Sequence, residues 1–447
     1  MNDTATPQRK PGSRSPATIV AICFVIIVFD GYDLVVYGAT LPSLLAYEQW
    51  ELSPGQAGAI GSYALIGMLL GALLSGWLVP RIGARKTILL SVTTFSVLMG
   101  LAALAPNPEV FGLLRFLAGL GLGGVVPTVI ALTVEYSPVR KRQFNNALMF
   151  SGYSVGGMGA ALAALAMLPE LSFRYLYALG MLPIFVVVPL AWAFLPESLG
   201  YLRSLGRTAE ADQLADRYGL CDTLDHSAEP SRTASLRDLV TGPRRLSLVF
   251  MVLAAFCGLL LVYGVNTWLP NIMRQAGYSL GSSLSFLLVL NMGAIFGALV
   301  FSRLADRFGS KPVTGISFLL AVGSILVLSL GFSLPIAMAA VAVAGMGTVG
   351  TQILVAGYAA AYFPDHERSR ALALVLGLGR VGAIFGPVLG GWIAASSLAV
   401  EWNFYVFAGF ALLGSLAIVS VRSTRVRTSD PQHGVTESQA PQHKISE

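Results

Sequence analysis

The sequence is poor in charged residues, cysteine and histidine. Only 12% of its 447 residues are Asp, Glu, Lys or Arg, while 55% are apolar; soluble globular domains carry about 25% charged residues. Such a chain cannot cover its apolar side chains with polar surface in water, which excludes disorder and most soluble enzymes. Three cysteines and four histidines, in no metal-ligand spacing, give no reason to expect a disulfide framework, a metal site or a cofactor. The composition predicts an integral membrane protein.

Twelve segments are long and apolar enough to cross a bilayer as helices, which needs about 20 mostly apolar residues each. The first is too long, and too polar at its centre, for a cleaved signal peptide. The predicted fold class is therefore an all-α membrane protein with twelve transmembrane helices. The spans cover residues 18–45, 57–79, 87–105, 109–134, 144–168, 173–195, 245–270, 281–302, 313–331, 335–362, 371–395 and 402–421.

The basic residues indicate the orientation in the membrane. If both termini are cytoplasmic, 25 of the 29 Lys and Arg residues fall in cytoplasmic segments, two (Arg174 and Arg274) in outer loops and two (Arg115 and Arg380) within spans. The positive-inside rule gives this bias for a multi-pass protein of the cell membrane. Because the net charge of +6 is scattered over short loops, no nucleic-acid partner is expected.

The two halves of the chain repeat each other. Arg81 and Arg307 each stand two residues before a glycine, 226 positions apart, and Pro138 and Pro364 show the same offset. A constant offset indicates a duplicated six-helix unit, with the ligand site between the halves near mid-membrane. The expected organisation is an N-terminal tail at 1–17, bundles at 18–195 and 245–421, a cytoplasmic linker at 196–244 and a C-terminal tail at 422–447.

Two further predictions concern the polar segments outside the bundles. In the linker, Arg207–Tyr218 either forms a short amphipathic helix or, as we favour, belongs to a solvated connection. The C-terminal tail is rich in Gln, Ser and Thr and is expected to be disordered.

Many of the 48 glycines lie inside predicted spans, above all in 109–134, 144–168 and 371–395. Glycine lets neighbouring helices approach closely. The function of these surfaces is either static tight packing or sliding as the bundles rock. No glycine-rich loop follows a soluble strand, so a phosphate loop and ATP as a partner are excluded.

Two short loops carry a family resemblance. Gly76-Trp-Leu-Val-Pro-Arg-Ile-Gly-Ala-Arg-Lys86 and Ser302-Arg-Leu-Ala-Asp-Arg-Phe-Gly-Ser-Lys311 resemble the two copies of the signature loop of the major facilitator superfamily, G-x-x-x-D-R-x-G-R-K. The first copy carries Pro80 where the family usually has an acid. The resemblance implies two pseudo-symmetric six-helix bundles and a gating or conformational role for the matching residues. These are Gly76, Arg81, Gly83, Arg85, Asp306, Arg307 and Gly309.

A narrower resemblance lies in the first span. Phe29-Asp-Gly-Tyr-Asp-Leu34 is similar to the D-G-x-D element of the aromatic acid:proton symporter family, and Gly121-Leu-Gly-Gly-Val-Val-Pro127 also resembles that family. Its members import benzoate-type acids. The resemblance implies proton-coupled import of a small aromatic carboxylate, such as benzoate or a hydroxybenzoate, by alternating access.

Acids inside a span need a reason, because a charge at mid-bilayer costs about 2.5–3.5 kcal/mol on insertion scales. Asp30 is predicted near mid-depth and Asp33 one turn outward on nearly the same face. Two carboxylates so close in apolar surroundings suit uptake of the coupled proton by one of them. Arg115 lies at a depth similar to that of Asp33, and the family fold brings these two spans to the central cavity, so we expect them to meet.

Arg380 is the one basic residue inside a span of the second half. A guanidinium can bind a carboxylate bidentately, so Arg380 either binds the substrate or pairs with an acid of the domain interface; Arg115 is the competing carboxylate partner. Aromatic candidates for stacking on the substrate ring are Tyr32, Tyr37, Tyr263, Trp268 and Tyr358. Asn266, Asn291 and Gln352 either bond a ring hydroxyl or, as we slightly favour, link helices.

Glu135 ends the fourth span. It either forms an inner-gate ion pair, with Arg140, Arg142 or the neighbourhood of Asp306, or is a plain solvated helix end.

The sequence as a whole predicts a monomeric secondary transporter rather than an enzyme. Two alternative hypotheses keep the fold. In one the cargo is a sugar acid or another organic acid, and in the other the protein exports drugs or metabolites. A membrane receptor would need a longer signalling domain than the 49-residue linker. An integral-membrane enzyme would need a His, Glu or Cys cluster at a catalytic depth, which the sequence does not have.

Overall fold

The structure is a computed structural model that describes residues 15–138, 141–220, 239 and 241–422. Within these residues, twelve spans are long and apolar enough to cross a membrane, which confirms the number predicted. Those of the first half are α1 (Pro16–Leu45), α2 (Pro54–Ile82), α3 (Ala84–Ala103), α4 (Pro108–Glu135), α5 (Arg142–Met167) and α6 with α7 (Arg174–Leu179, Leu182–Phe194). Those of the second half are α11 (Arg245–Gln275), α12 (Leu280–Phe308), α13 (Ser310–Leu328), α14 with η3 and α15 (Leu334–Gly345, Met346–Gly350, Thr351–Tyr362), α16 (Asp365–Ala395) and α17 (Glu401–Ser420). The expected tails lie almost wholly outside the described residues, as do Arg140 and 221–238 of the linker.

Local sequence signals set where the helices begin. The Ser53 hydroxyl accepts a hydrogen bond from the backbone N–H of Gln56 (3.3 Å), and the Gln56 side chain accepts one from the backbone of Ser53 (3.1 Å). This reciprocal capping satisfies backbone donors at the start of α2. Pro54 and Pro108 then occupy first positions, where the missing N–H leaves no bond unmade.

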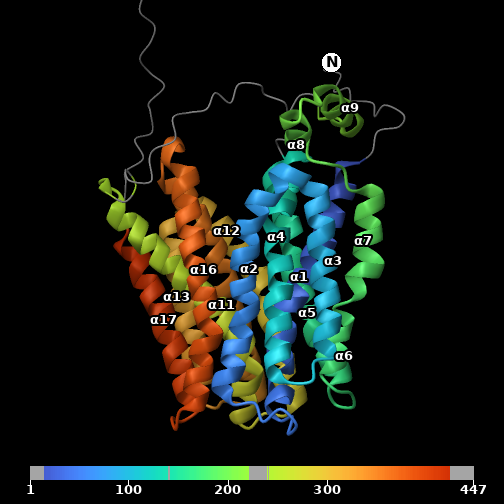
Figure 1. Ribbon diagram of the computed structural model, residues 1–447. Coiled ribbons are helices and arrows are strands. Elements are labelled where there is room, and N and C mark those ends of the chain that lie inside the picture. Colours follow the sequence, from blue (N-terminus) through green and yellow to red (C-terminus); the bar gives the residue numbers. More distant parts are fainter. Residues whose placement is uncertain (1–14, 139–140, 221–238, 240, 423–447) are drawn as a thin grey trace, which may run out of the picture.

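The two halves stand side by side and repeat each other in detail (Figure 1). Gly83, between α2 and α3, and Gly309, between α12 and α13, both adopt φ = +90°, a conformation that favours glycine. Gly156 brings α5 against α1, and Gly382, 226 positions later, brings α16 against α11 in the same way. The duplicated sequence pattern therefore corresponds to duplicated packing.

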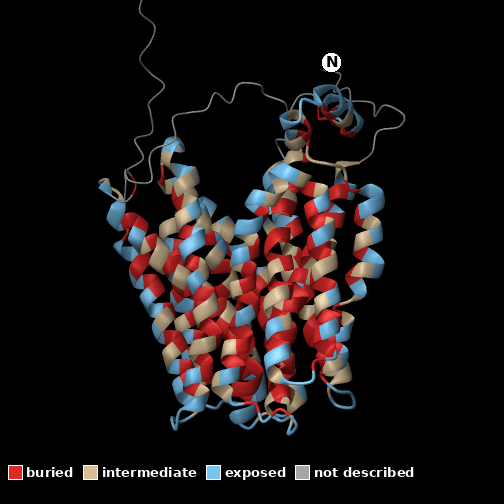
Figure 2. Cartoon of the chain, in the orientation of Figure 1, coloured by how far each residue is buried: buried red, intermediate tan, exposed pale blue. Residues whose placement is uncertain are grey.

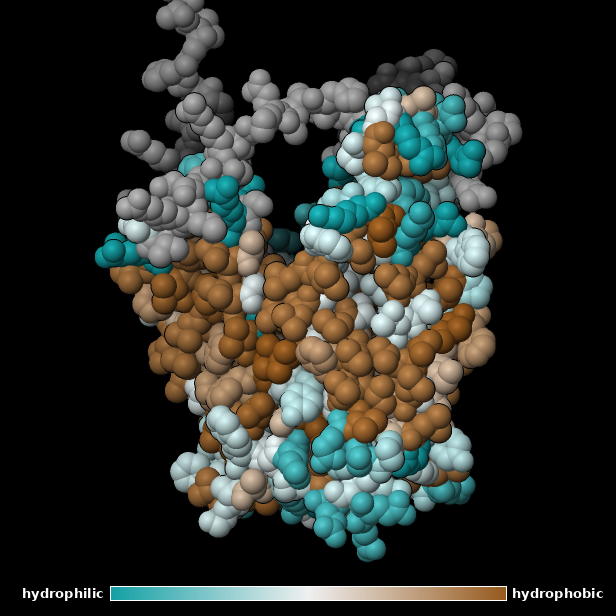
Figure 3. Space-filling model, in the orientation of Figure 1, coloured by the Kyte–Doolittle hydropathy of each residue, from teal (hydrophilic) through white to brown (hydrophobic). Residues whose placement is uncertain are grey.

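The outer surface matches a bilayer. A broad apolar band separates polar ends in Figure 3. Large apolar side chains such as Leu73, Phe185 and Phe296, all on spans, are more than half exposed. Buried residues concentrate inside each half (Figure 2). The exposed apolar side chains are thus placed to face lipid rather than water.

The halves meet through α2 with α16, α1 with α11 and α5 with α12. Near the start of α2, Gly58 packs on Pro387 and Gly391 of α16, and Ser62 donates a hydrogen bond to the Ile384 carbonyl. These contacts lie away from the linker. On the end of the molecule that carries the linker, Figure 3 shows a hollow between the halves.

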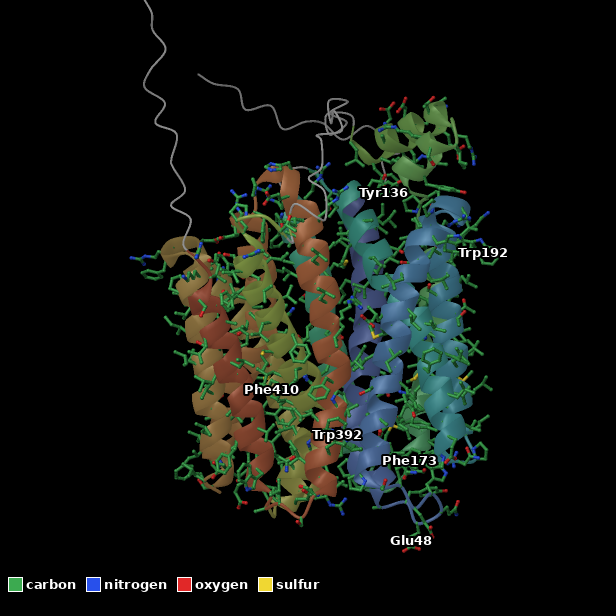
Figure 4. All side chains as sticks on the ribbon, turned by 60° about the vertical axis from the view of Figure 1, so that its left-hand side comes forward. Glu48, Tyr136, Phe173, Trp192, Trp392 and Phe410 are labelled. Atoms are coloured by element: carbon green, nitrogen blue, oxygen red, sulfur yellow. The ribbon has the colours of Figure 1, made fainter. Side chains whose placement is uncertain are left out.

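The first part of the linker folds onto the N-terminal half instead of forming a solvated connection. Helices α8 (Leu199–Ser204) and α9 (Thr208–Tyr218) bury Leu202 and Tyr218 in the same apolar cluster as Tyr136. The Tyr136 and Tyr218 rings meet edge to face at 5.2 Å between centroids. Figure 4 places Tyr136 at the linker end of the bundle. Of the two expectations for Arg207–Tyr218, the helix is the one present.

Candidate functional site

Asp33 of α1 and Arg115 of α4 form an ion pair inside the N-terminal half, as their matched depth and the family resemblance together predict. Both side chains are 3% exposed. The Arg115 guanidinium lies 5.8 Å from the centre of the Tyr37 ring and 5.9 Å from that of Tyr177. Each charge is therefore balanced within the protein, and the aromatic rings shield the pair from water.

Asp30, one turn from Asp33 and near the middle of α1, has a different environment. It is 1% exposed, and within the described part of the chain neither of its carboxyl oxygens has a hydrogen-bond partner. Burial of an ionised carboxylate without a partner is costly. Asp30 is thus the intramembrane acid whose carboxyl oxygens have no hydrogen-bond or ion-pair partner among the described residues.

Arg380 lies at the middle of α16 in the C-terminal half. Its charge interacts with Asp30, Tyr153 and Tyr263, yet Arg380 belongs to none of the ion pairs formed by the described residues. Of the two intramembrane arginines, Arg115 has a carboxylate partner, and Arg380 has none among the residues that the structure describes.

The hydroxyl groups of Tyr153 on α5 and Tyr263 on α11 are 3.0 Å apart, which joins the two halves beside these charges. The sequence singled out Tyr263 but missed Tyr153. A signal was present, because Tyr153 lies between Gly152 and Gly156, which bring α5 onto α1. Tyr177 was also missed; its hydroxyl meets that of Thr40 at 2.9 Å.

A pocket in the middle of the molecule collects most of these groups. It is formed by α1, α2, α4, α5 and α11, and so by both halves. Its lining residues are Asp30, Asp33, Leu34, Tyr37, Gly61, Ala64, Leu65, Met68, Arg115, Tyr153, Tyr263 and Thr267.

The other aromatic candidates have structural partners. Tyr32 donates to the Leu176 carbonyl (2.7 Å), and Trp268 donates to that of Pro387 (2.8 Å). Tyr37 lines the pocket but directs its hydroxyl to the Ala57 carbonyl (2.5 Å). Tyr358 contacts Tyr362 near the linker end of α15, away from the pocket.

The polar amide candidates lie in the C-terminal half. The amide of Asn291 donates to Leu287 (2.9 Å) and, at 3.5 Å, to Asn266, whose own amide donates to Val262 (2.7 Å). This pair joins α11 to α12. The Gln352 carbonyl oxygen faces Gly258 and has no hydrogen-bond partner among the described residues.

The first signature loop is completed by an acid that the sequence analysis did not select. Glu197, after α7, accepts a hydrogen bond from the backbone N–H of Arg85 (3.1 Å) and lies against Gly83. The Arg85 side chain bonds the Trp192 carbonyl, and Arg81 lies over the Trp77 ring at 3.9 Å. An acid thus occupies this corner although the loop itself carries Pro80. A Cβ at Gly76, by contrast, would have no neighbour within 4 Å.

The remaining gate candidates are separate from one another. Glu135 accepts hydrogen bonds from the backbone of Gly200 (2.6 Å) and the hydroxyl of Ser198 (3.2 Å), and so holds the start of α8. Arg142 instead donates to the Ser137 carbonyl (3.4 Å). Neither Glu135 nor Asp306 takes part in an ion pair of the described chain. Arg307 lies near the Phe308 ring, 5.3 Å from its centre.

Comparison with known proteins assigns the chain to a family. A family model described as the Major Facilitator Superfamily matches residues 23–304 and 284–445. The chain is 39% identical to a gentisate transporter of Corynebacterium glutamicum, covering 91% of this chain and 87% of the relative. It is 34% identical to a benzoate transport protein of Acinetobacter baylyi, covering 92% and 91%. The xylose transporter XylE of E. coli, in a partially occluded inward-open conformation, has a similar fold, with a TM-score of 0.73, 16% identity, and 90% and 96% of the chains covered.

Proposed function

The chain belongs to the major facilitator superfamily and is a multi-pass membrane transporter, not an enzyme; from this premise we propose that it imports a small aromatic carboxylate together with a proton. Relatives named for benzoate, gentisate and 4-hydroxybenzoate transport, at 30–39% identity, support that cargo. The acid is of the benzoate or hydroxybenzoate class. The alternatives are another organic or sugar acid carried by the same fold, and export of a drug or metabolite.

The observation that carries the proposal is the free guanidinium of Arg380. Because Asp33 neutralises Arg115, the positive charge available to a ligand at mid-membrane is that of Arg380. A planar guanidinium binds a carboxylate in a two-point geometry. A cationic drug would be repelled there, which disfavours drug export.

Asp30 is proposed as the proton carrier and Asp33 as a structural partner of Arg115. An ionised Asp30 attracts Arg380 and competes with the substrate carboxylate for it. Protonation of Asp30 removes that competition, so proton binding strengthens substrate binding. By linkage, a bound substrate strengthens proton binding by the same factor. This reciprocity provides symport without direct contact between proton and substrate.

Transport is proposed to proceed by alternating access, in a monomer whose termini are both cytoplasmic. The hollow on the linker end then faces the cytoplasm, and the joint between α2 and α16 closes the outer side. The residues proposed to act in gating are Gly76, Arg81, Gly83, Arg85, Glu135, Arg142, Asp306, Arg307 and Gly309. Glu135 would do so through α8, since it bonds to the start of that helix.

Uptake of radiolabelled benzoate and hydroxybenzoates into proteoliposomes with an imposed pH gradient tests the proposal. Arg380→Gln should raise the KM about 10- to 150-fold, since a hydrogen bond to a charged group contributes about 1.5–3 kcal/mol. Asp30→Asn should abolish accumulation driven by the pH gradient but retain exchange of labelled for unlabelled acid. Arg274→Gln, at an exposed helix end, is the matched arginine control. Undiminished gradient-driven accumulation in Asp30→Asn, or an unchanged KM in Arg380→Gln, would refute the assignment.

A further inference from the structure

The hydroxyl pair of Tyr153 and Tyr263 is a polar feature of the pocket that the proposed transport cycle leaves unexplained. The two oxygens are 3.0 Å apart, and the tyrosines come from different halves. Both side chains are partly exposed and line the pocket that contains Asp30. Arg380 is near enough to interact electrostatically with each of them. Arg380 also interacts electrostatically with Asp30, so its charge acts on the region that the pair faces.

The pair has unused hydrogen-bonding capacity. In the described part of the chain, the hydroxyl of each tyrosine is bonded to that of the other and to nothing else. A phenol offers one donor and one or two acceptor sites. One shared hydrogen bond therefore leaves the pair with one free donor and at least one free acceptor.

The neighbouring amides are less suited to binding a ligand. Asn266 and Asn291, which the sequence suggested for a ring hydroxyl, use their amide donors on carbonyls of their own helices and on each other. Gly157, one turn after Tyr153, lies directly against the Asn291 carboxamide and closes the approach from α5. The two tyrosine hydroxyls are thus polar atoms that the pocket can offer to a ring substituent, one from each half.

We propose that Tyr153 and Tyr263 together recognise a ring hydroxyl of the aromatic acid and make the transporter selective for hydroxylated over unsubstituted acids. This rests on the proposed function, with the carboxylate on Arg380. A substrate hydroxyl can accept from the free tyrosine donor and donate to the free lone pair. Because the tyrosines belong to different halves, such a ligand also bonds α5 to α11 and stabilises the state in which the halves are joined.

Single hydroxyl deletions test the proposal. Tyr153→Phe and Tyr263→Phe should each lower the preference for the best hydroxybenzoate over benzoate, expressed as a ratio of kcat/KM values, about 3- to 10-fold, the effect of one neutral hydrogen bond. Benzoate uptake should fall by a smaller factor than hydroxybenzoate uptake, because benzoate has no ring hydroxyl to lose a partner. The double variant should lose little more than either single variant, because the two hydroxyls act as one site. Tyr362→Phe is the control, since its hydroxyl also pairs with another hydroxyl, that of Ser247 at 2.7 Å, but within one half.

The wild-type protein provides a second measurement that needs no substitution. Because Arg380 would hold the carboxylate and the tyrosine pair the ring hydroxyl, one positional isomer among the 2-, 3- and 4-hydroxybenzoates should be preferred, and its methoxy counterpart, which cannot donate, should lose that preference. Equal losses for benzoate and the hydroxybenzoate in the Phe variants, or equal uptake of all isomers, overturns the inference while leaving aromatic acid transport intact. If the wild type takes up none of these acids, it is the proposed function that fails.

Discussion

At the scale of single residues, the two intramembrane acids differ in what their neutralisation should do to the stability of the protein. Arg115 is compensated by Asp33 in a buried pair, while Arg380 and Asp30 lack such partners in the described structure. Breaking a buried pair leaves one uncompensated charge, whereas neutralising an unpartnered acid removes a cost. Stability and transport should therefore depend on different residues of the same site.

Asp33→Asn is expected to lower the free energy of unfolding by about 3–5 kcal/mol, because it leaves the Arg115 charge buried without a partner. Asp30→Asn should have little effect on stability, since its carboxyl oxygens make no hydrogen bond to lose. Thermal unfolding of the purified protein in detergent measures both. The double variant Asp33→Asn/Arg115→Gln should recover part of the loss. A double variant as unstable as the sum of its single variants would show that the pair is not coupled.

The charges of the site could be predicted from the sequence, whereas the pairing of Tyr153 with Tyr263 could not, although Gly152 and Gly156 mark this stretch of α5 as a close helix contact. Asp30, Asp33 and Arg380 stand out because each is a charge in an apolar span, and matched depth together with the family fold predicted the contact of Asp33 with Arg115. Tyr153 is one of 15 tyrosines, and its role depends on which face of α5 meets α11. Neither hydropathy nor span length determines that face. The sequence therefore does not predict which side chains meet when that depends on how the helices pack.

At the scale of helices, the glycines of α5 separate into two kinds. A Cβ on Gly156 would lie 2.7 Å from the backbone N of Tyr32 and closer still to the Val28 carbonyl oxygen. A Cβ on Gly159, one turn further along the helix, would meet nothing within 4 Å. The contact of α5 with α1, which positions Asp30, thus depends on the first glycine and not on the second.

Gly156→Ala is expected to push α5 away from α1, lowering the melting temperature and also the rate of uptake. Gly159→Ala, on the same helix, should leave both unchanged or slightly raise stability, because alanine favours helix more than glycine does. The two variants are compared by thermal unfolding in detergent and by initial rates in proteoliposomes. Equal effects of the two substitutions would contradict the packing argument.

Helix positions were predictable to within six residues because a bilayer dictates long apolar segments. The favoured prediction of a solvated connection at the linker helix α9 was wrong for a physical reason. Two of the residues it buries, Ala211 and Ala215, are small and weakly apolar, so its sequence resembles a solvated connection. Its folding depends on a surface supplied by Tyr136 and its neighbours, which lie more than 70 positions earlier in the chain.

At the scale of the whole molecule, the two ends of the interface between the halves differ. Away from the linker, α2 and α16 touch backbone to backbone at Gly58 and Gly391, and a Cβ on Gly391 would lie 2.8 Å from the Pro54 carbonyl oxygen and 3.0 Å from the Gly58 Cα. The linker end has the hollow seen in Figure 3. A carrier that alternates between two openings must separate α2 from α16 in its other state.

Gly391→Leu is expected to shift the protein toward that other state, because the leucine side chain cannot fit against Gly58 when the two helices are in contact. A single cysteine introduced at Ala64, which lines the pocket, should then react faster with a membrane-impermeant thiol reagent added from the side opposite the linker. Uptake should slow, since the state in which α2 and α16 are in contact becomes harder to reach. Gly409→Leu serves as the control, because a Cβ there would have no neighbour within 4 Å. If the labelling rate rises equally in both variants, or in neither, the α2–α16 contact is not the closed gate of the transporter.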